Sequence, residues 1–317
     1  MTASPADASS PAPLPRHPCL APGHGVLRRD ADHLQVGLDA PRRVVAPDLP
    51  DVRSVLDALV ESRRPTPTTS PGRRALADLL AAGLVVDADA LACCVRASTD
   101  PAATRAVFAR HGLDAPRRWA ARGSARVGID ATAEVAGLVE TLLRESGVTG
   151  PVADHDPDVV LVLRESEGEP DLVDAWARDE VPHLVVSSSG DTVTIGPFVE
   201  PGATACVRCV DAHHRDSDPR RPLVLEQHRR QSGPLVRDPL LRRLSLAWAV
   251  RDLVSWVDGD RPSSWSATVT LDARLEATRT TWSRHPYCGC GWAEPHQYSG
   301  ASLPSIDLRC SREHRSQ

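Results

Sequence analysis

The first part of the chain alternates short apolar segments with turn-forming residues. The segments VLRRD, HLQVGL and RRVVAP lie between residues 25 and 48 and are bounded by Asp, Gly and Pro. This pattern is typical of short β-strands joined by tight turns. In residues 49–62 the apolar positions are spaced as on one face of a helix, namely Val52, Val55, Leu56 and Leu59.

A second helix is predicted after a loop rich in Pro, Thr and Ser at residues 63–72. It places Leu76, Leu79 and Leu80 on one face, ends before Gly83 and continues into a short apolar strand. Strands, two helices and a final strand predict a small winged-helix module at residues 23–88. The alanine-rich residues 89–122 predict a helical connector.

From residue 123 the pattern becomes that of an α/β protein. The segments SARVGI, VVLVL and PHLVVSSS are apolar runs of strand length, separated by the helix-forming stretches TAEVAGLVETLLRES and DLVDAWARDEV. This alternation predicts a parallel, doubly wound sheet. Residues 238–257 then predict a long helix, and WSATVTLD with LEATRTTWS predicts an antiparallel pair. We place this α/β domain at residues 123–292.

The two ends of the chain differ from the rest in composition. Residues 1–22 are rich in Pro, Ala and Ser and lack an apolar signal-peptide core, so we expect a disordered tail. Residues 293–317 are assigned as a C-terminal tail. No apolar run reaches the length of a membrane span. A net charge of −5 gives no electrostatic basis for nucleic-acid binding. We therefore expect a cytoplasmic protein with neither membrane nor nucleic acid among its partners.

Lysine and asparagine are absent from the sequence, and all 37 basic residues are arginine. A GC-rich coding sequence is a sufficient cause. The consequence is nevertheless physical, because any mechanism that places a lysine ammonium on a phosphate is closed to this chain.

The cysteines carry the strongest chemical signal. CVRC and CGC place four thiols in two close pairs, Cys206 with Cys209 and Cys288 with Cys290. In a reducing compartment such pairs indicate metal ligands, and four thiolates predict a closed, structural zinc site. The alternative is two unrelated pairs of buried or redox-active cysteines. The remaining cysteines have the character of ordinary residues, namely Cys19, Cys93, Cys94 and Cys310.

The turn after the first α/β strand is a candidate nucleotide loop. In nucleotide-binding folds this turn is glycine-rich, so that phosphate can approach the N-terminus of the helix. Here it reads Gly128-Ile129-Asp130-Ala131-Thr132-Ala133, with a single glycine and a carboxylate that would repel a triphosphate. Gly128 and Asp130 are therefore candidate residues of a degenerate cofactor loop. The favoured interpretation is a plain helix N-cap by Asp130 or Thr132.

Four further polar residues were considered as sites. Asp156 and Asp158 precede a buried strand and are either metal or ribose ligands or, more simply, turn formers. His213 and His214 follow CVRC, and we interpret them as solvated loop residues. No nucleophile–base arrangement has local sequence support, so no catalytic residue is assigned.

The segment GPFVEPGATACVRCVDAHHRDSDP, followed by the long helix, two strands and HPYCGCGW, resembles a known family. It is similar to the ThiF/MoeB-type (ubiquitin-activating-like) fold, as found in the partner protein of thiazole/oxazole-modified peptide (bacteriocin) cyclodehydratases. The resemblance covers residues 120–292 and extends to the N-terminal module. In that family a PqqD-like winged helix binds the leader of a precursor peptide as an added β-strand.

The resemblance also defines what this sequence has changed. Active members of the superfamily adenylate a carboxyl terminus with ATP and Mg²⁺, using a glycine-rich loop, arginine and lysine. Here the loop keeps a single glycine, and the sequence contains no lysine. CGC replaces the second CxxC pair, which leaves one residue fewer between the two cysteines but keeps four ligands. The resemblance thus implies a Rossmann-like fold and structural zinc without adenylation.

Three functional hypotheses follow. The first is a non-catalytic protein that presents a leader peptide to a separate YcaO-type enzyme, which uses the ATP. The second is a working adenylyltransferase that activates a peptide or protein carboxylate, so the sequence leaves enzymatic activity open. The third is a regulatory or scaffold protein whose winged helix contacts DNA or another protein. A homodimer through the sheet domain is compatible with the resemblance.

Overall fold

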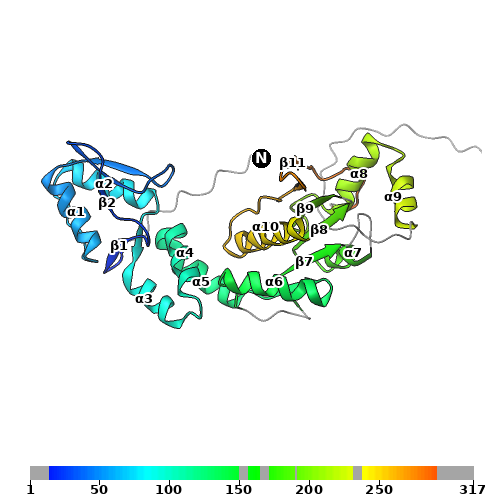
Figure 1. Ribbon diagram of the computed structural model, residues 1–317, viewed down its shortest axis with the longest axis horizontal. Helices are drawn as coiled ribbons and strands as arrows, with labels where there is room; N and C mark the ends of the chain where they lie inside the picture. Colours follow the sequence, from blue (N-terminus) through cyan, green and yellow to red (C-terminus); the bar gives the residue numbers. More distant parts are fainter. Residues whose placement is uncertain (1–13, 150–155, 165–170, 190, 231–237, 291–317) are drawn as a thin grey trace, which may run out of the picture.

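A computed structural model describes residues 14–149, 156–164, 171–189, 191–230 and 238–290. A small mixed module and a six-stranded sheet domain lie at opposite ends of the molecule, and three helices connect them (Figure 1). None of the helices in the described residues is long and apolar enough to cross a membrane.

The N-terminal module follows the predicted order of strands, two helices and a strand. Three strands form an antiparallel sheet in the order β2-β3-β4, and β1 pairs with β5. The module consists of β1 (Pro18–Leu20), β2 (Val26–Arg28), β3 (His33–Val36), β4 (Val44–Pro47), α1 (Pro50–Val60), α2 (Ser70–Ala81) and β5 (Val85–Asp87). The predicted helix face is the one buried in α1, where Val52, Val55, Leu56 and Leu59 enter the core.

Strand β1 corrects one sequence prediction. Residues 18–20 fall inside the tail that we expected to be disordered, yet they form a strand paired with Val85–Asp87 of β5. The local sequence has no strand signal, and the partner that orders it is far along the chain. Residues 1–13 of that tail, and all of the predicted C-terminal tail 293–317, lie outside the described residues.

The connector is helical, as its composition predicts. It comprises α3 (Ala88–Ala97), α4 (Pro101–His111), the 3₁₀ turn η1 (Gly112–Asp114) and α5 (Ala115–Ser124). Aspartates begin the first two helices, because Asp87 and Asp100 each accept two backbone N–H groups of the first turn. These two caps fix where α3 and α4 begin.

A six-stranded sheet organises the second domain, in the order β11-β10-β9-β8-β7-β6. Strands β6, β7 and β8 are parallel, whereas β9, β10 and β11 are antiparallel. The domain consists of β6 (Val127–Asp130), α6 (Ala133–Glu145), β7 (Val159–Arg164), α7 (Asp171–Arg178), β8 (His183–Ser189), β9 (Thr192–Val199), α8 (Val207–Ser217), α9 (Arg221–Arg230), α10 (Pro239–Val257), β10 (Ala267–Asp272) and β11 (Ala277–Thr281).

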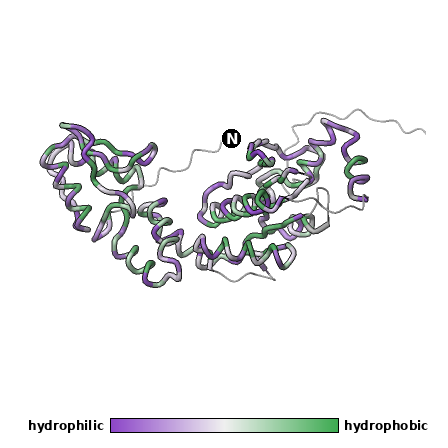
Figure 2. The backbone as a smooth tube through the Cα atoms, viewed as in Figure 1, coloured by the Kyte–Doolittle hydropathy of each residue, from purple (hydrophilic) through white to green (hydrophobic). Residues whose placement is uncertain are grey.

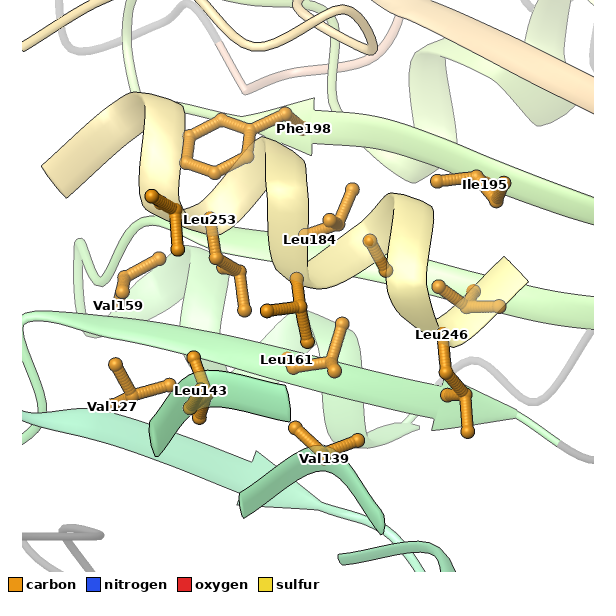
Figure 3. Close-up of a cluster of buried hydrophobic side chains, with 14 of the residues drawn as sticks. Val127, Val139, Leu143, Val159, Leu161, Leu184, Ile195, Phe198, Leu246 and Leu253 are labelled. Carbon is orange, nitrogen blue, oxygen red and sulfur yellow. The ribbon is translucent and has the colours of Figure 1, made fainter. Parts of the chain in front are cut away.

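The main core lies between one face of this sheet and helices α6 and α10. Figure 3 shows Leu246 and Leu253 of α10 in the same cluster as Leu161 and Leu184 of the sheet. Along β7, Val159 and Leu161 point to this core, whereas Val160 and Val162 contact Val173 of α7 on the opposite face. Apolar residues are frequent in the central part of this domain, where the strands and α10 lie (Figure 2).

The two parallel crossovers have opposite hands. Helix α6 covers one face of the sheet and α7 the other, yet β6, β7 and β8 step across the sheet in one direction. Two crossovers that run in the same direction across the sheet but cover opposite faces have opposite handedness. One of them therefore departs from the right-handed rule for parallel strand–helix–strand connections, which holds in about 98% of cases.

A truncated doubly wound sheet explains this exception. In the full fold the strand order is 3-2-1-4-5-6, so strand 1 lies beside strand 4. Strands β6, β7 and β8 match positions 1, 4 and 5. Residues 146–158, between α6 and β7, are too few for the intervening strands and helices of positions 2 and 3. The predicted parallel strands are present, but the doubly wound prediction is corrected to a shortened sheet that keeps parallel strands at positions 1, 4 and 5.

Candidate metal centre and the nucleotide position

The four cysteines of CVRC and CGC come together in space. The Cys206 Sγ lies 3.7 Å from the Cys209 Sγ and 3.4 Å from the Cys288 Sγ, and the Cys209 Sγ lies 3.4 Å from the Cys290 Sγ. All four sulfur atoms lie within 4.8 Å of one another. A tetrahedral ion with Zn–S bonds of about 2.3 Å requires S···S separations of about 3.8 Å. The cluster therefore fits a four-coordinate metal ion without rearrangement of the backbone.

Two structural elements supply the cluster. Cys206 is the N-cap of α8 and Cys209 lies in its first turn, so the helix sets the spacing of this pair. The other pair follows β11 in a short turn, where the Cys288 N–H donates to the carbonyl of His285. Gly289 has a φ of 79°, a left-handed conformation that lets two thiols separated by one residue face the same point.

The cluster already favours a thiolate at Cys209. The Cys206 thiol and the backbone N–H of His285, 3.2 Å from the sulfur, donate to it and lower its pKa. The pKa of Cys206 is raised by the same shared hydrogen bond and by burial. The thiolate is the form that binds metal.

His285 and Asp216 brace the centre from outside and were not found from the sequence. The buried His285 ring donates from Nε2 to the Asp216 carboxylate at 2.8 Å, while its Nδ1 accepts the Tyr287 N–H. His285 thus joins the CGC turn to α8 by its side chain and contacts Cys209 by its backbone. The two residues are 69 positions apart, so spacing could not reveal the pair, although a histidine just before CGC is a local signal.

His213 and His214 differ from their predicted role as solvated loop residues. Both lie in α8 and are half-buried against Trp282, with ring centroids 5.8 Å and 4.9 Å from the indole. His213 also meets His285 edge-on at 4.9 Å. Trp282 is the residue that follows β11. The two histidines therefore form an aromatic contact between α8 and the segment after β11.

The candidate nucleotide loop is shorter than predicted. Gly128 and Asp130 belong to β6, and only Ala131 and Thr132 separate this strand from α6. Thr132 occupies the N-cap position, but its side chain makes no cap hydrogen bond. A Cβ on Gly128 would lie 3.1 Å from Val160 and 3.3 Å from Pro157. The glycine therefore accommodates the neighbouring strand and does not face a phosphate.

Little space exists at the carboxyl ends of the parallel strands. The cavity there has a volume of about 60 Å³, whereas ligand pockets typically measure about 300–1,000 Å³. Among its lining residues are Ala131, Thr132, Arg164 and Arg242. This is where the doubly wound fold holds a nucleotide.

Asp156 and Asp158 form ion pairs at the amino end of β7. Asp158 accepts the backbone N–H of Arg126 at 2.7 Å and its guanidinium at 3.1 Å, and Asp156 accepts the same guanidinium at 3.0 Å. The amino end of β7 is opposite to the nucleotide position, which lies at the carboxyl ends of the parallel strands. Their turn-forming interpretation agrees with the geometry, and the four cysteines are the predicted site residues that the fold brings together.

Comparison with known proteins gives matches at the level of structure. No family model and no curated protein sequence matches this chain. The heterocyclase TruD superposes with a TM-score of 0.67 at 19% identity, over 87% of this chain and 43% of the heterocyclase. A heterocyclase in complex with substrate and cofactor gives a TM-score of 0.66 at 16% identity, over 92% of this chain and 41% of that one.

A second kind of neighbour matches along its whole length. MccB of E. coli, in complex with MccA-N7isoASN, superposes with a TM-score of 0.62 at 12% identity, over 86% of this chain and 99% of MccB. The chain therefore spans less than half of the heterocyclases and nearly all of MccB. These neighbours confirm the ThiF-type fold predicted from the sequence.

Proposed function

We propose that this protein is a non-catalytic partner in the biosynthesis of a modified peptide, which binds the leader of a precursor and presents it to a separate modifying enzyme. The heterocyclase and MccB neighbours favour a peptide as the partner, since two of these structures hold a substrate or MccA-derived peptide. In this proposal the modifying enzyme is of the YcaO type, uses the ATP itself, and works with this protein in the cytoplasm.

The truncated sheet carries the non-catalytic part of the proposal. Strand β6 is an edge strand among the described residues, and the positions of strands 2 and 3 have no counterpart. In the full fold an acidic residue about 20 positions after the glycine loop binds the ribose, and the phosphates occupy the crevice beside strand 1. Without those strands, and with a cavity of about 60 Å³, the described residues leave no space of suitable size for ATP at the nucleotide position.

The N-terminal module supports leader binding. Strand β4 is at the edge of its three-stranded sheet and lies beside α2, so its outer backbone groups can pair with an added strand. Val45 of β4 and Leu27 of β2 are 40% and 44% exposed on the outer face of this sheet. Exposed apolar side chains beside an open edge suit an extended peptide that carries apolar residues. We interpret the module as a PqqD-like winged helix.

The cysteine cluster is proposed to hold structural zinc. Four thiolates in tetrahedral spacing leave no open coordination position, so the ion would cross-link α8 to the turn after β11 and take no part in chemistry. A reducing cytoplasm keeps the thiols available for the metal.

The test is a pair of titrations on the full-length protein. One uses Mg-ATP and the other uses the N-terminal half of short peptides encoded beside the gene. We expect no heat with Mg-ATP and one-site binding with the cognate leader.

Val45→Asp should weaken leader binding at least tenfold, because it places a charge next to the added strand. The matched control is Val60→Asp, since Val60 is a 59% exposed valine at the end of α1. Micromolar binding of Mg-ATP would overturn the proposal.

A working adenylyltransferase is the second candidate function. The match over 99% of MccB favours it, because structures of MccB contain ATP or AMPCPP. It requires Mg²⁺-dependent exchange between ATP and pyrophosphate in the presence of the peptide, and a lack of exchange rules it out. A homodimer through the sheet domain belongs to either proposal, and light scattering of the purified protein tests it.

A further inference from the structure

A pocket of about 500 Å³ lies between α7, the start of α8 and the turn that carries Gly289 and Cys290. Its volume falls within the range of ligand pockets, about 300–1,000 Å³. At its base the amino end of β8 meets the carboxyl end of β9, where His183 pairs with Val199. The nucleotide position lies at the other end of the parallel strands, so this pocket is a separate site.

The floor of the pocket is buried, whereas its rim is exposed and charged. The buried floor residues are Val173, His183, Val199, Thr204 and Cys206, and the exposed charged residues of the rim are Arg178, Glu180 and Arg208. The Thr204 hydroxyl already donates to the Glu200 carbonyl at 3.3 Å and accepts the Glu200 N–H at 2.8 Å. The half-buried carboxylate of Glu200 accepts the indole N–H of Trp256. The pocket therefore suits a ligand with an apolar body at the floor.

His183 is a fully buried polar side chain on this floor. Its Nδ1 lies 2.8 Å from the carbonyl oxygen of Val181 and donates to it, because a carbonyl oxygen only accepts. Burial lowers the pKa of the ring, which is therefore neutral at neutral pH. In a neutral imidazole with a proton on Nδ1, Nε2 carries a lone pair. Among the described residues this Nε2 has no hydrogen-bond partner, so the floor presents an acceptor that lacks a donor.

We propose that this pocket receives a neutral aromatic group of the indole or phenol class, whose single N–H or O–H donates to Nε2 of His183. Such a ring combines a large apolar body with one donor, which normally finds a partner when it is buried. The apolar body fits the walls formed by Ala177, Val199 and Val207. A cationic donor fits less well, because it would lose its hydration beside a neutral imidazole.

Two sources can supply this chemistry, namely a free small molecule and a side chain of this protein. Cys290 lines the pocket, and Trp292 follows it by two residues in the sequence. The two sources make the same hydrogen bond and differ in whether the wild-type pocket is open to an added ligand. The inference does not rest on the proposed function, because it involves neither the N-terminal module nor the nucleotide position.

The first test changes the ligand and leaves the pocket intact. The probes are indole and N-methylindole, which has the same ring system without the N–H. Each is titrated into the full-length wild type and into Trp292→Ala, and binding is followed by ligand-observed NMR. We expect indole to bind at least about tenfold more tightly than N-methylindole, because the methylated ring leaves Nε2 buried without a donor. Binding by both proteins indicates a free ligand, whereas binding by Trp292→Ala alone indicates that Trp292 supplies the donor.

The second test changes the acceptor. His183→Asn keeps an N–H near the position of Nδ1 for the Val181 carbonyl and removes Nε2, so the variant should fold and bind the two probes equally. His33→Asn is the matched control, because His33 is an exposed histidine of β3, and it should keep the wild-type preference for indole.

Three results would overturn the inference. The first is binding of neither probe to either protein, which would assign Nε2 to a bound water molecule. The others are equal binding of the two probes by the protein with the open pocket, and a preference for indole that persists in His183→Asn. In each case the proposed function stands, because His183→Asn should respond to Mg-ATP and to the leader peptide as the wild type does.

Discussion

At the scale of single residues, Cys288 shows how one side chain fixes a distant part of the fold. It lies in a short turn after an edge strand, and its sulfur meets that of Cys206 at the start of α8. We expect Cys288→Ser to abolish stoichiometric zinc and to lower the melting temperature strongly, because the binding energy of structural zinc is folding energy. Metal analysis and calorimetry measure both effects. Cys93→Ser, at an exposed cysteine of α3, should change neither. Wild-type melting of Cys288→Ser would contradict structural zinc.

The cysteines were predictable because close spacing within each pair is itself a chemical signal. His285 and Asp216 were not, because their ring-to-carboxylate contact exists only after α8 and the CGC turn have been brought together. The packing role of Gly128 could not be predicted either. Its missing Cβ makes room for Val160 of the next strand, a requirement that is visible in the register and not in the sequence.

At the scale of elements, the beginning of α2 depends on a neighbouring helix. Asp51 of α1 accepts hydrogen bonds from the backbone and hydroxyls of Thr68 and Thr69, which lower its pKa to about 2. A Cβ on Gly72 would lie 2.0 Å from this carboxylate and 3.2 Å from Pro67. Gly72→Ala should therefore destabilise the protein, although alanine normally favours a helix.

The control for Gly72→Ala is Gly137→Ala in the exposed part of α6, where a Cβ would meet nothing within 4 Å. That variant should be stabilised by about 0.5–1 kcal/mol, the usual advantage of alanine over glycine in a helix. Chemical denaturation compares the two. Stabilisation by Gly72→Ala would show that Asp51 does not hold the start of α2.

Helix positions were well predicted because a buried stripe recurs with the helical period, as in α1 and α2. Strand β1 was missed because its order comes from pairing with β5. The opposite hands of the two crossovers could not be predicted either. A strand–helix–strand sequence does not show which face of the sheet its helix covers. The strands of positions 2 and 3 are not detected as missing, because strand and helix segments still alternate along the sequence without them.

At the scale of the whole molecule, a buried ion pair joins the connector to the sheet domain. Arg122 of α5 donates to both oxygens of Asp258, at 2.8 Å and 2.6 Å, at the end of α10, and both side chains are fully buried. His111 of α4 lies 3.3 Å from the same carboxylate. Burial alone would raise the pKa of Asp258, but Arg122 and His111 hold it well below its ordinary value of 3.8. The connector is thus joined to the sheet domain through this carboxylate, beside a second, more exposed ion pair between Arg118 and Asp260.

This coupling predicts how the molecule unfolds. Asp258→Asn leaves the buried Arg122 without its charge partner, which typically costs about 3–5 kcal/mol. We expect calorimetry to show one transition for the wild type and two for Asp258→Asn, because the sheet domain no longer unfolds together with the connector. Asp114→Asn is the control. Asp114 pairs with Arg117 and Arg118 on the same connector but is 42% exposed, so its loss should cost about 1 kcal/mol or less and leave one transition.

Acid should act on the wild type as Asp258→Asn does at neutral pH. A carboxylate whose folded pKa is depressed stabilises the protein above its unfolded pKa, and this contribution is lost as the pH falls through the folded value. The single transition should therefore separate into two only below about pH 4, near the unfolded pKa of an aspartate. Asp258→Asn should show two transitions across this range without that pH dependence. A wild type that keeps one transition down to its acid unfolding would mean that the connector and the sheet domain are joined by their apolar contacts and not by this ion pair.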